Sequence, residues 1–193
     1  MPRGVAIPEL RQQLFDAADR LLAREGPHGL SSRAVTTEAG CAKGLLHNHF
    51  SDFDGFLAEF VIDRFHRAVE DSARMTAQVG EGSVAANLAT AAAGLFDSRA
   101  LAVATLVMAR PSVMTRVHGH RHTPAMFAVQ QVFVSYLEAE QRLGRVRADA
   151  DIETVVLALL STAHHLCIMH SNSIPDPLPA VRRVADVLVT AIT

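Results

Sequence analysis

Apolar residues recur at three- and four-residue spacing along almost the whole chain, and this spacing is the strongest constraint on its fold. Runs that alternate apolar and polar residues, as half-buried strands do, are scarce. Alanine, leucine and arginine, which all favour helices, are abundant in the composition. The sequence therefore predicts an all-α protein with about nine helices. We expect them at residues 8–25, 31–39, 42–49, 52–79, 83–97, 100–108, 124–143, 151–172 and 178–192.

Glycine and proline residues mark where several of these helices end. Gly26-Pro27 follows the first helix, and Gly40 separates the second helix from the third at a point where a positive φ is tolerated. Three short helices thus occupy only the first 50 residues, and long amphipathic segments follow. We expect a small N-terminal domain at residues 1–51 and a larger helical domain at residues 52–193.

Length and composition argue against several classes of protein. No apolar run approaches the roughly 20 residues that cross a bilayer, and the N-terminus lacks the apolar core of a signal peptide, so we expect a cytoplasmic protein. Cys41 and Cys167 lie far apart without CxxC spacing, which favours neither a disulfide framework nor a thiolate metal site. The net charge of −2 argues against a wholly basic surface but allows a local basic face.

Residues 31–50 have the pattern of a helix-turn-helix, in which the second helix of the pair enters the major groove of DNA. Val35, Ala39 and Phe50 are among the apolar residues that can bury the inner faces of the two helices. Gly44 removes a side chain where the backbone approaches DNA, and Lys43, the only lysine of the chain, adjoins it. The predicted DNA-contacting residues are Ser31, Arg33, Ala42, Lys43, Gly44, Leu45, His47, Asn48 and His49.

The same segment resembles a known family. Residues 39–50, AGCAKGLLHNHF, are similar to the TetR-family signature A-G-V-S-x-G-x-L-Y-x-H-F. Residues 17–26, AADRLLAREG, and then Leu30-Ser31 and Arg33 resemble the first helix of that family and its approach to the second. The resemblance covers about the first 60 residues, and beyond them the chain agrees only in its long helices and in a GRVRAD stretch at residues 144–149.

The resemblance implies a homodimeric transcriptional repressor without catalytic activity or a cofactor. Each protomer would read one half of a palindromic operator, and a small molecule bound in the C-terminal domain would lower the affinity for DNA. The last two helices would dimerise as a four-helix bundle. We place this interface on Val155, Leu159, Val184 and Leu188.

Three residues depart from the family pattern. Ala42 replaces a serine that could cap the third helix, which removes an interaction of about 0.5–2 kcal/mol. His47 replaces a tyrosine, and its imidazole can still donate to a phosphate but titrates near neutral pH. Phe53 replaces a lysine near the start of the fourth helix, and this change removes a positive charge.

Methionine and aromatic residues of the C-terminal region are candidates for an apolar ligand pocket, because flexible methionine side chains adapt to apolar ligands. Packing within the core is the competing interpretation for each of them. His164 and His165 are adjacent on a predicted helix, so they diverge by about 100° and only one of them can face a given cavity. The candidates for ligand contact are Phe96, Met108, Met114, Phe127, Tyr136 and His164.

His118, His120 and His122 form an HxHxH run that could bind Zn²⁺ or Ni²⁺, although few acidic or thiol partners lie close in sequence and a solvated loop is the favoured interpretation. A metal-dependent enzyme is therefore one rival function, but no nucleophile elbow, phosphate-binding glycine loop or HExxH motif supports it. A second rival is a dimeric ligand-binding module that has lost sequence-specific DNA binding, which the changes at Ala42 and Phe53 motivate. We expect double-stranded DNA, an apolar effector and a second copy of the chain as partners, and no membrane.

Overall fold

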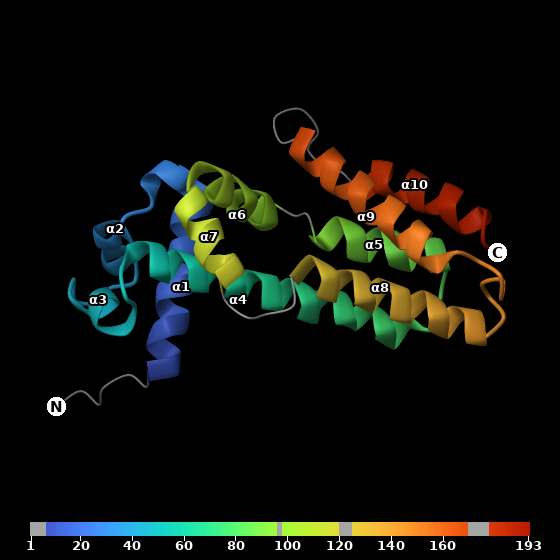
Figure 1. Cartoon of the computed structure of the whole chain (residues 1–193), viewed down its shortest axis with the longest axis horizontal. Helices are drawn as coiled ribbons and strands as arrows, with labels where there is room; N and C mark the ends of the chain where they lie inside the picture. The colour runs from blue at the N-terminus through green and yellow to red at the C-terminus, as the bar shows by residue number, and fades with distance from the viewer. Residues whose placement is uncertain (1–6, 96–97, 120–124, 170–177) are drawn as a thin grey trace. The chain divides into compact units, whose positions relative to one another are not determined.

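The computed structural model describes residues 7–95, 98–119, 125–169 and 178–193, and within them it contains helices and no strand (Figure 1). The prediction of an all-α fold is confirmed. The elements in chain order are α1 (Ile7–Glu25), η1 (Pro27–Gly29), α2 (Ser32–Glu38), α3 (Leu45–His49), α4 (Phe53–Ala73), η2 (Arg74–Gln78), α5 (Val84–Leu95), α6 (Ser98–Ala109), α7 (Pro111–Gly119), α8 (Ala125–Arg142), α9 (Ile152–Met169) and α10 (Leu178–Thr190).

The chain forms two compact units that are not continuous in sequence. The described part of the N-terminal unit comprises residues 7–64 and 98–119, and that of the C-terminal unit comprises residues 65–95, 125–169 and 178–193. Helices α6 and α7 thus pack with the N-terminal helices, and α6 contacts α1. The functional division between residues 51 and 52 remains a prediction.

The core of the N-terminal unit forms where the apolar stripe of α1 meets α2, α3 and the first part of α4. Leu14, Phe15 and Leu21 of α1 are buried there. The ring centroids of Phe15 and Phe50 are 6.1 Å apart. Those of Phe50 and Phe56 are 5.0 Å apart, and these two rings are edge-to-face. Edge-to-face aromatic pairs contribute roughly 0.5–1.5 kcal/mol beyond their burial. This cluster fixes the end of α3 against α1 and α4.

Three elements differ from the sequence prediction. The single helix expected at residues 52–79 consists of α4, which ends at Ala73, and the 3-10 helix η2. The third helix was expected from residue 42, but α3 begins at Leu45, because neither Ala42 nor Gly44 offers a side-chain acceptor to cap the free N–H groups. The helix α7 was not predicted. Pro111 suits a first helical turn, since its missing N–H would have no partner there, so the proline begins a new helix instead of a loop.

The C-terminal unit is a helical bundle of α5, α8, α9, α10 and the end of α4. Helix α10 packs on α5 and α9, and α8 packs on α9 (Figure 1). Its core contains Leu88, Phe133, Val156 and Leu160. Within the described residues, no helix is both long enough and apolar enough to span a membrane.

A buried polar network closes one end of this unit. Glu140 on α8 is fully buried, accepts a hydrogen bond from the backbone N–H of Gly80 at 3.1 Å, and lies 3.2 Å from the guanidinium of Arg145. The hydroxyl of Tyr136, one turn earlier, accepts a hydrogen bond from Asn87 at 2.9 Å. A buried carboxylate is costly in free energy unless it is paired, so losing either contact of Glu140 would destabilise the fold. The contacts therefore hold the turn between η2 and α5 against α8.

Candidate nucleic-acid interface

The turn between α2 and α3 is held by backbone and side-chain hydrogen bonds. Ser31 caps α2, and its hydroxyl accepts a hydrogen bond from the N–H of Ala34 at 3.1 Å. Gly40 has φ 66°, and the N–H of Cys41 then donates to the carbonyl of Thr36 at 3.0 Å. The Gln13 amide of α1 donates to the Ala39 carbonyl at 2.6 Å. The local sequence therefore produces the two-helix arrangement in a defined geometry.

The predicted inner residues of α2 and α3 are buried and most of the predicted DNA-contacting residues are exposed. Val35, Ala39, Leu46 and Phe50 face the core of the N-terminal unit. Leu45 and His49 are half-buried, which leaves their contribution to DNA contact a prediction. The exposed members of the predicted set are Ser31, Arg33, Ala42, Lys43, Gly44, His47 and Asn48.

Two cations on the exposed surface of α2 and the α2–α3 turn differ from the paired arginines of the N-terminal unit. Arg33 and Lys43 have no carboxylate partner within the described residues, so their charges are available to an external anion. Most protein contacts to DNA are made with phosphate oxygens, and arginine and lysine are the usual donors. The paired arginines of the unit are Arg11, Arg20, Arg24, Arg64, Arg110 and Arg116.

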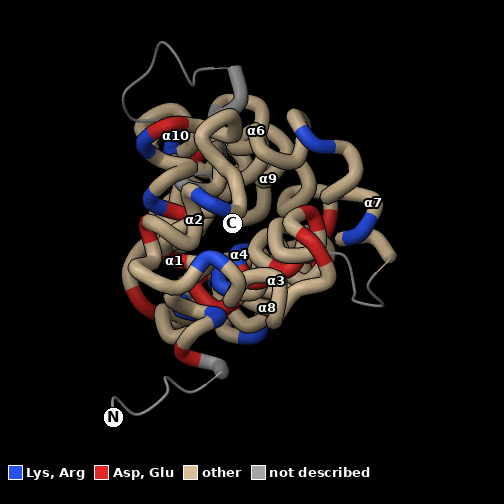
Figure 2. Tube along the Cα trace, turned by 90° about the vertical axis from the view of Figure 1, so that its left-hand side faces the viewer, with Lys and Arg blue, Asp and Glu red and all other residues tan. Residues whose placement is uncertain are grey.

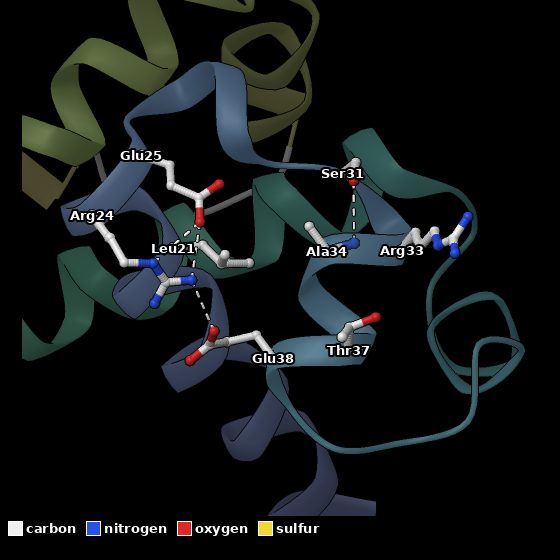
Figure 3. Close-up of a pocket in the computed structure, with 8 residues that line it drawn as sticks. All are labelled: Leu21, Arg24, Glu25, Ser31, Arg33, Ala34, Thr37 and Glu38. Carbon is white, nitrogen blue, oxygen red and sulfur yellow. Dashed lines mark hydrogen bonds and ion pairs between the residues drawn. The ribbon is translucent and has the colours of Figure 1, made fainter.

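An open hollow of about 580 Å³ between α1 and α2 shows this contrast directly (Figure 3). On one side, Arg24 lies 3.0 Å from both Glu25 and Glu38. Arg33 lines the same hollow from the start of α2, but its guanidinium points away from these carboxylates. The hydrogen bond from Arg20, followed by that from Arg24, lowers the pKa of Glu38.

The net charge of the surroundings is mixed. Figure 2 shows basic and acidic positions interspersed along the helices of the N-terminal unit, in agreement with the net charge of −2 for the chain. The described residues of this unit thus do not form a wholly basic face. Attraction to phosphates must depend on individual cations, which makes the pairing state of each arginine important.

The start of α4 follows α3 directly and carries two carboxylates. Asp52 accepts a hydrogen bond from the N–H of Gly55 at 2.7 Å, and this bond, followed by the guanidinium of Arg116, lowers the pKa of Asp52. Phe53, which stands where the TetR pattern has lysine, stacks on Phe56 with ring centroids 5.8 Å apart. The guanidinium of Arg110 lies 5.4 Å from the centroid of the Phe53 ring.

Arg110 and Arg116 are residues of this region that the sequence did not identify. Both come from the α6–α7 segment, which lies about 60 residues further along the chain than the α4 carboxylates that they contact. The local sequence offers one signal, Pro111 directly after Arg110. A proline indicates a helix boundary, but it does not indicate which residue the arginine contacts.

The predicted ligand-contacting residues are distributed over both units. Met108, with 76% of its surface exposed, and the half-buried Met114 belong to the N-terminal unit. In the C-terminal unit, 52% of Phe127 is exposed, His164 is exposed, and Tyr136 is buried in the polar network. Phe96 lies outside the described residues. A ligand role for these residues remains a prediction.

The predicted dimer residues separate into two groups. Val155 and Leu159 are buried in the core of the C-terminal unit, whereas Val184 and Leu188 are only partly buried against it. The exposed apolar side chains of the same two helices are Leu157 and Val187, with 57% and 71% of their surface exposed. Spacing did not single out Leu157, because α9 is apolar around much of its circumference.

The metal hypothesis gains no support from the described residues. His118 is exposed in the last turn of α7, and His120 and His122 lie outside the described residues. No group of three potential metal ligands occurs in the part of the chain that the structure describes. Burial raises the pKa of the Cys41 thiol, which disfavours a reactive thiolate there.

Comparisons with known proteins agree with this geometry. Residues 14–60 match the family model of bacterial regulatory proteins of the tetR family. Over 52 residues, which are 27% of this chain and 28% of the other, the chain is 40% identical to an uncharacterized helix-turn-helix-type transcriptional regulator of Haemophilus influenzae. The chain thus spans only about a quarter of the length of this curated relative.

Similarity to solved structures extends over nearly the whole chain. A Mesorhizobium loti protein assigned to the TetR family of transcriptional regulators has a TM-score of 0.74 at 18% identity, with 97% of this chain and 96% of that chain covered. The transcriptional regulator FadR of Bacillus subtilis, solved in complex with stearoyl-CoA, has a TM-score of 0.68 at 17% identity, with 94% and 99% covered. At these identities the likeness establishes the fold.

Proposed function

We propose that this chain, which is a TetR-family transcriptional regulator, acts as a homodimer that binds a palindromic operator and is released by a small molecule. The observation that carries the proposal is the helix-turn-helix surface on which Arg33 and Lys43 are exposed without carboxylate partners. The α3 helix would enter the major groove, with Lys43 and Asn48 close to base edges or phosphates.

Dimerisation through α9 and α10 would present two such surfaces on one face of DNA. The exposed Leu157 and Val187, together with the partly buried Val184 and Leu188, supply apolar surface on these two helices. A two-fold axis makes such an interface self-complementary. The distance between the two half-sites of the operator would then match the distance between the α3 helices of the two protomers. Val155 and Leu159 would support this face from within the core.

An apolar effector is the proposed ligand of the C-terminal region. The support is the candidate apolar and aromatic side chains of this region, Phe127 and Tyr136 among them, together with the fold that the chain shares with FadR of Bacillus subtilis, which was solved with stearoyl-CoA. A ligand shifts an equilibrium only by its difference in affinity for the two states, so the effector would need to bind the DNA-free conformation more tightly. Repression in the cytoplasm, without catalysis, is part of this proposal.

A ligand-binding module without sequence-specific DNA binding is the second candidate. Ala42 and the uncapped start of α3 favour it, because both weaken the helix that would read DNA. Selection from random duplexes with the purified protein, at low and at moderate salt, separates the two functions. An enriched palindrome that survives the salt increase supports the operator-binding dimer, and salt-sensitive binding without enrichment supports the module.

A further inference from the structure

Two carboxylates lie immediately beyond the reading helix. Asp52 and Asp54 flank Phe53 at the start of α4, and Asp52 is three residues beyond His49, the last residue of α3. Since successive Cα atoms are about 3.8 Å apart, the Cα of Asp52 lies at most about 11 Å from that of His49. This span is close to the Debye length of roughly 8–10 Å at physiological salt. Unpaired, these carboxylates would repel the phosphates of bound DNA.

Side chains of α7 and of the α6–α7 junction pair with both carboxylates within the N-terminal unit. A guanidinium nitrogen of Arg116 lies 2.7 Å from Asp52, and one of Arg110 lies 3.3 Å from Asp54. The hydroxyl of Ser112 donates to the other oxygen of Asp54 at 2.7 Å. Each carboxylate beside the reader is thus matched by one arginine.

Further contacts hold the two arginines in place. Arg110 donates a second hydrogen bond, at 3.4 Å, to the carbonyl of Leu30 just before α2, and its guanidinium lies over the ring of Phe53. Gly55 leaves space for Ser51 beside these contacts, because a Cβ at position 55 would lie 2.5 Å from the Ser51 hydroxyl. The aromatic ring at position 53, which replaces a family lysine, thus serves as a platform for the cation of Arg110 at the α6–α7 junction.

We propose that Arg110 and Arg116 are positioning residues for DNA binding, which neutralise Asp52 and Asp54 beside the reading helix. Displacement of α7 together with the α6–α7 junction leaves two negative charges per protomer uncompensated near the DNA backbone and lowers the affinity for DNA. The arginines act through the carboxylates and need no contact with DNA. This inference rests on the proposed function, and it adds an electrostatic control of the same site.

A double-mutant cycle on Asp52 and Arg116 tests the proposal. The variants are Arg116→Gln, Asp52→Asn and the double variant, and Asn is chosen because it retains the ability to cap α4. The equilibrium Kd for the operator selected from random duplexes is measured for each full-length protein over a series of salt concentrations. The control is Arg74→Gln, which breaks the exposed pair between Arg74 and Asp71 in the C-terminal unit.

We expect the Kd of Arg116→Gln to rise on the order of fivefold at low salt. In each protomer the substitution removes one exposed ion pair and leaves the charge of Asp52 uncompensated beside the DNA. The increase shrinks as salt is raised. The double variant binds within about twofold of wild type, and Asp52→Asn alone binds at least as tightly as wild type. Arg74→Gln leaves the Kd unchanged.

Three results would overturn the inference. One is a double variant that binds as weakly as Arg116→Gln, which would show that Arg116 contacts DNA or supports the fold. Another is an unchanged Kd for Arg116→Gln. If Arg116→Gln unfolds, the same cycle with Arg110→Gln and Asp54→Asn gives the decision. The third is a wild-type protein without an operator preference, which would also refute the proposed function, whereas the first two leave that function intact.

Discussion

The hydroxyl of Ser32 on α2 lies 3.5 Å from Nε2 of His47 on α3, so the imidazole connects the two helices of the reader. His47 is also exposed and shares its surface with Arg33 and Lys43. A neutral imidazole can accept from Ser32, whereas a protonated one has two N–H donors, one of which can point to a phosphate. The charge of this residue is therefore expected to affect DNA affinity.

We expect operator affinity to rise as the pH falls, because a protonated imidazole at position 47 would add a positive charge and a second N–H donor beside the phosphates. A charge-assisted hydrogen bond in place of a neutral one predicts a gain of roughly fivefold. Fluorescence anisotropy at constant ionic strength measures it. His47→Gln should flatten the profile and His165→Gln, in the C-terminal unit, should not; a pH dependence that survives His47→Gln contradicts the assignment.

Replacing Lys43 by alanine should weaken operator binding and reduce its salt dependence. A lysine that neutralises one phosphate contributes about 0.9 to the slope of log K against log salt, so two protomers predict a decrease of about 1.8. If Lys43 instead reads a guanine, the selected operator changes at that position. Titrations at several salt concentrations measure the slope, with Arg142→Ala on α8 as a control. Neither role holds if affinity, slope and sequence preference all stay as in wild type.

The cap of α2 should be measurable in the stability of the protein. Ser31→Ala removes the acceptor for the N–H of Ala34, and we expect the free energy of unfolding to fall by about 0.5–2 kcal/mol. Ser31→Asp retains a capping oxygen and should lose much less. Urea unfolding followed by circular dichroism gives both values, and equal losses for the two variants would show that the cap is not the cause.

The buried Tyr136 predicts a loss of stability in alkali. Burial raises the pKa of Tyr136 from its ordinary 10.0 to about 12, the hydrogen bond from Asn87 lowers it, and Glu140 raises it. Since the folded state disfavours tyrosinate, the stabilisation is complete below pH 10 and is lost as the pH rises toward 12. Tyr136→Phe should remove this part of the pH dependence.

Tyr136 is the only tyrosine of the chain, and the chain has no tryptophan, so the ultraviolet absorbance of tyrosinate reports this one residue. We expect the tyrosinate signal to appear together with the loss of helical circular dichroism. A tyrosinate signal at about pH 10 in a protein that is still fully helical would contradict the buried environment.

Periodicity and breakers predicted the all-α fold and the helix-turn-helix because these features depend on residues close in sequence. The stripe that contains Leu14 and Leu21 identifies α1 without knowledge of the helices that pack on it. Gly40 identifies the turn because glycine tolerates a positive φ, and the observed φ is 66°. The start of α3 was less predictable, since it depends on whether a side chain such as Ala42 can cap the helix.

Contacts between distant segments were not predictable from spacing. An apolar stripe shows that α6 needs a partner but does not show that the partner is α1, and the pairs Arg110–Asp54 and Arg116–Asp52 follow from that packing. In α9, apolar residues occur on most sides, so periodicity could not distinguish the buried Val155 from the exposed Leu157. Such assignments require the positions of neighbouring helices.

The most direct test of the central claim is the ratio of two dissociation constants. The Kd of the wild-type protein is measured for the selected operator and for a scrambled duplex of the same length and composition, both at physiological salt. The account predicts a ratio of at least about 10³, which is the lower limit for specific recognition. A ratio near one would contradict a sequence-reading role for α3 and would leave a helical ligand-binding protein.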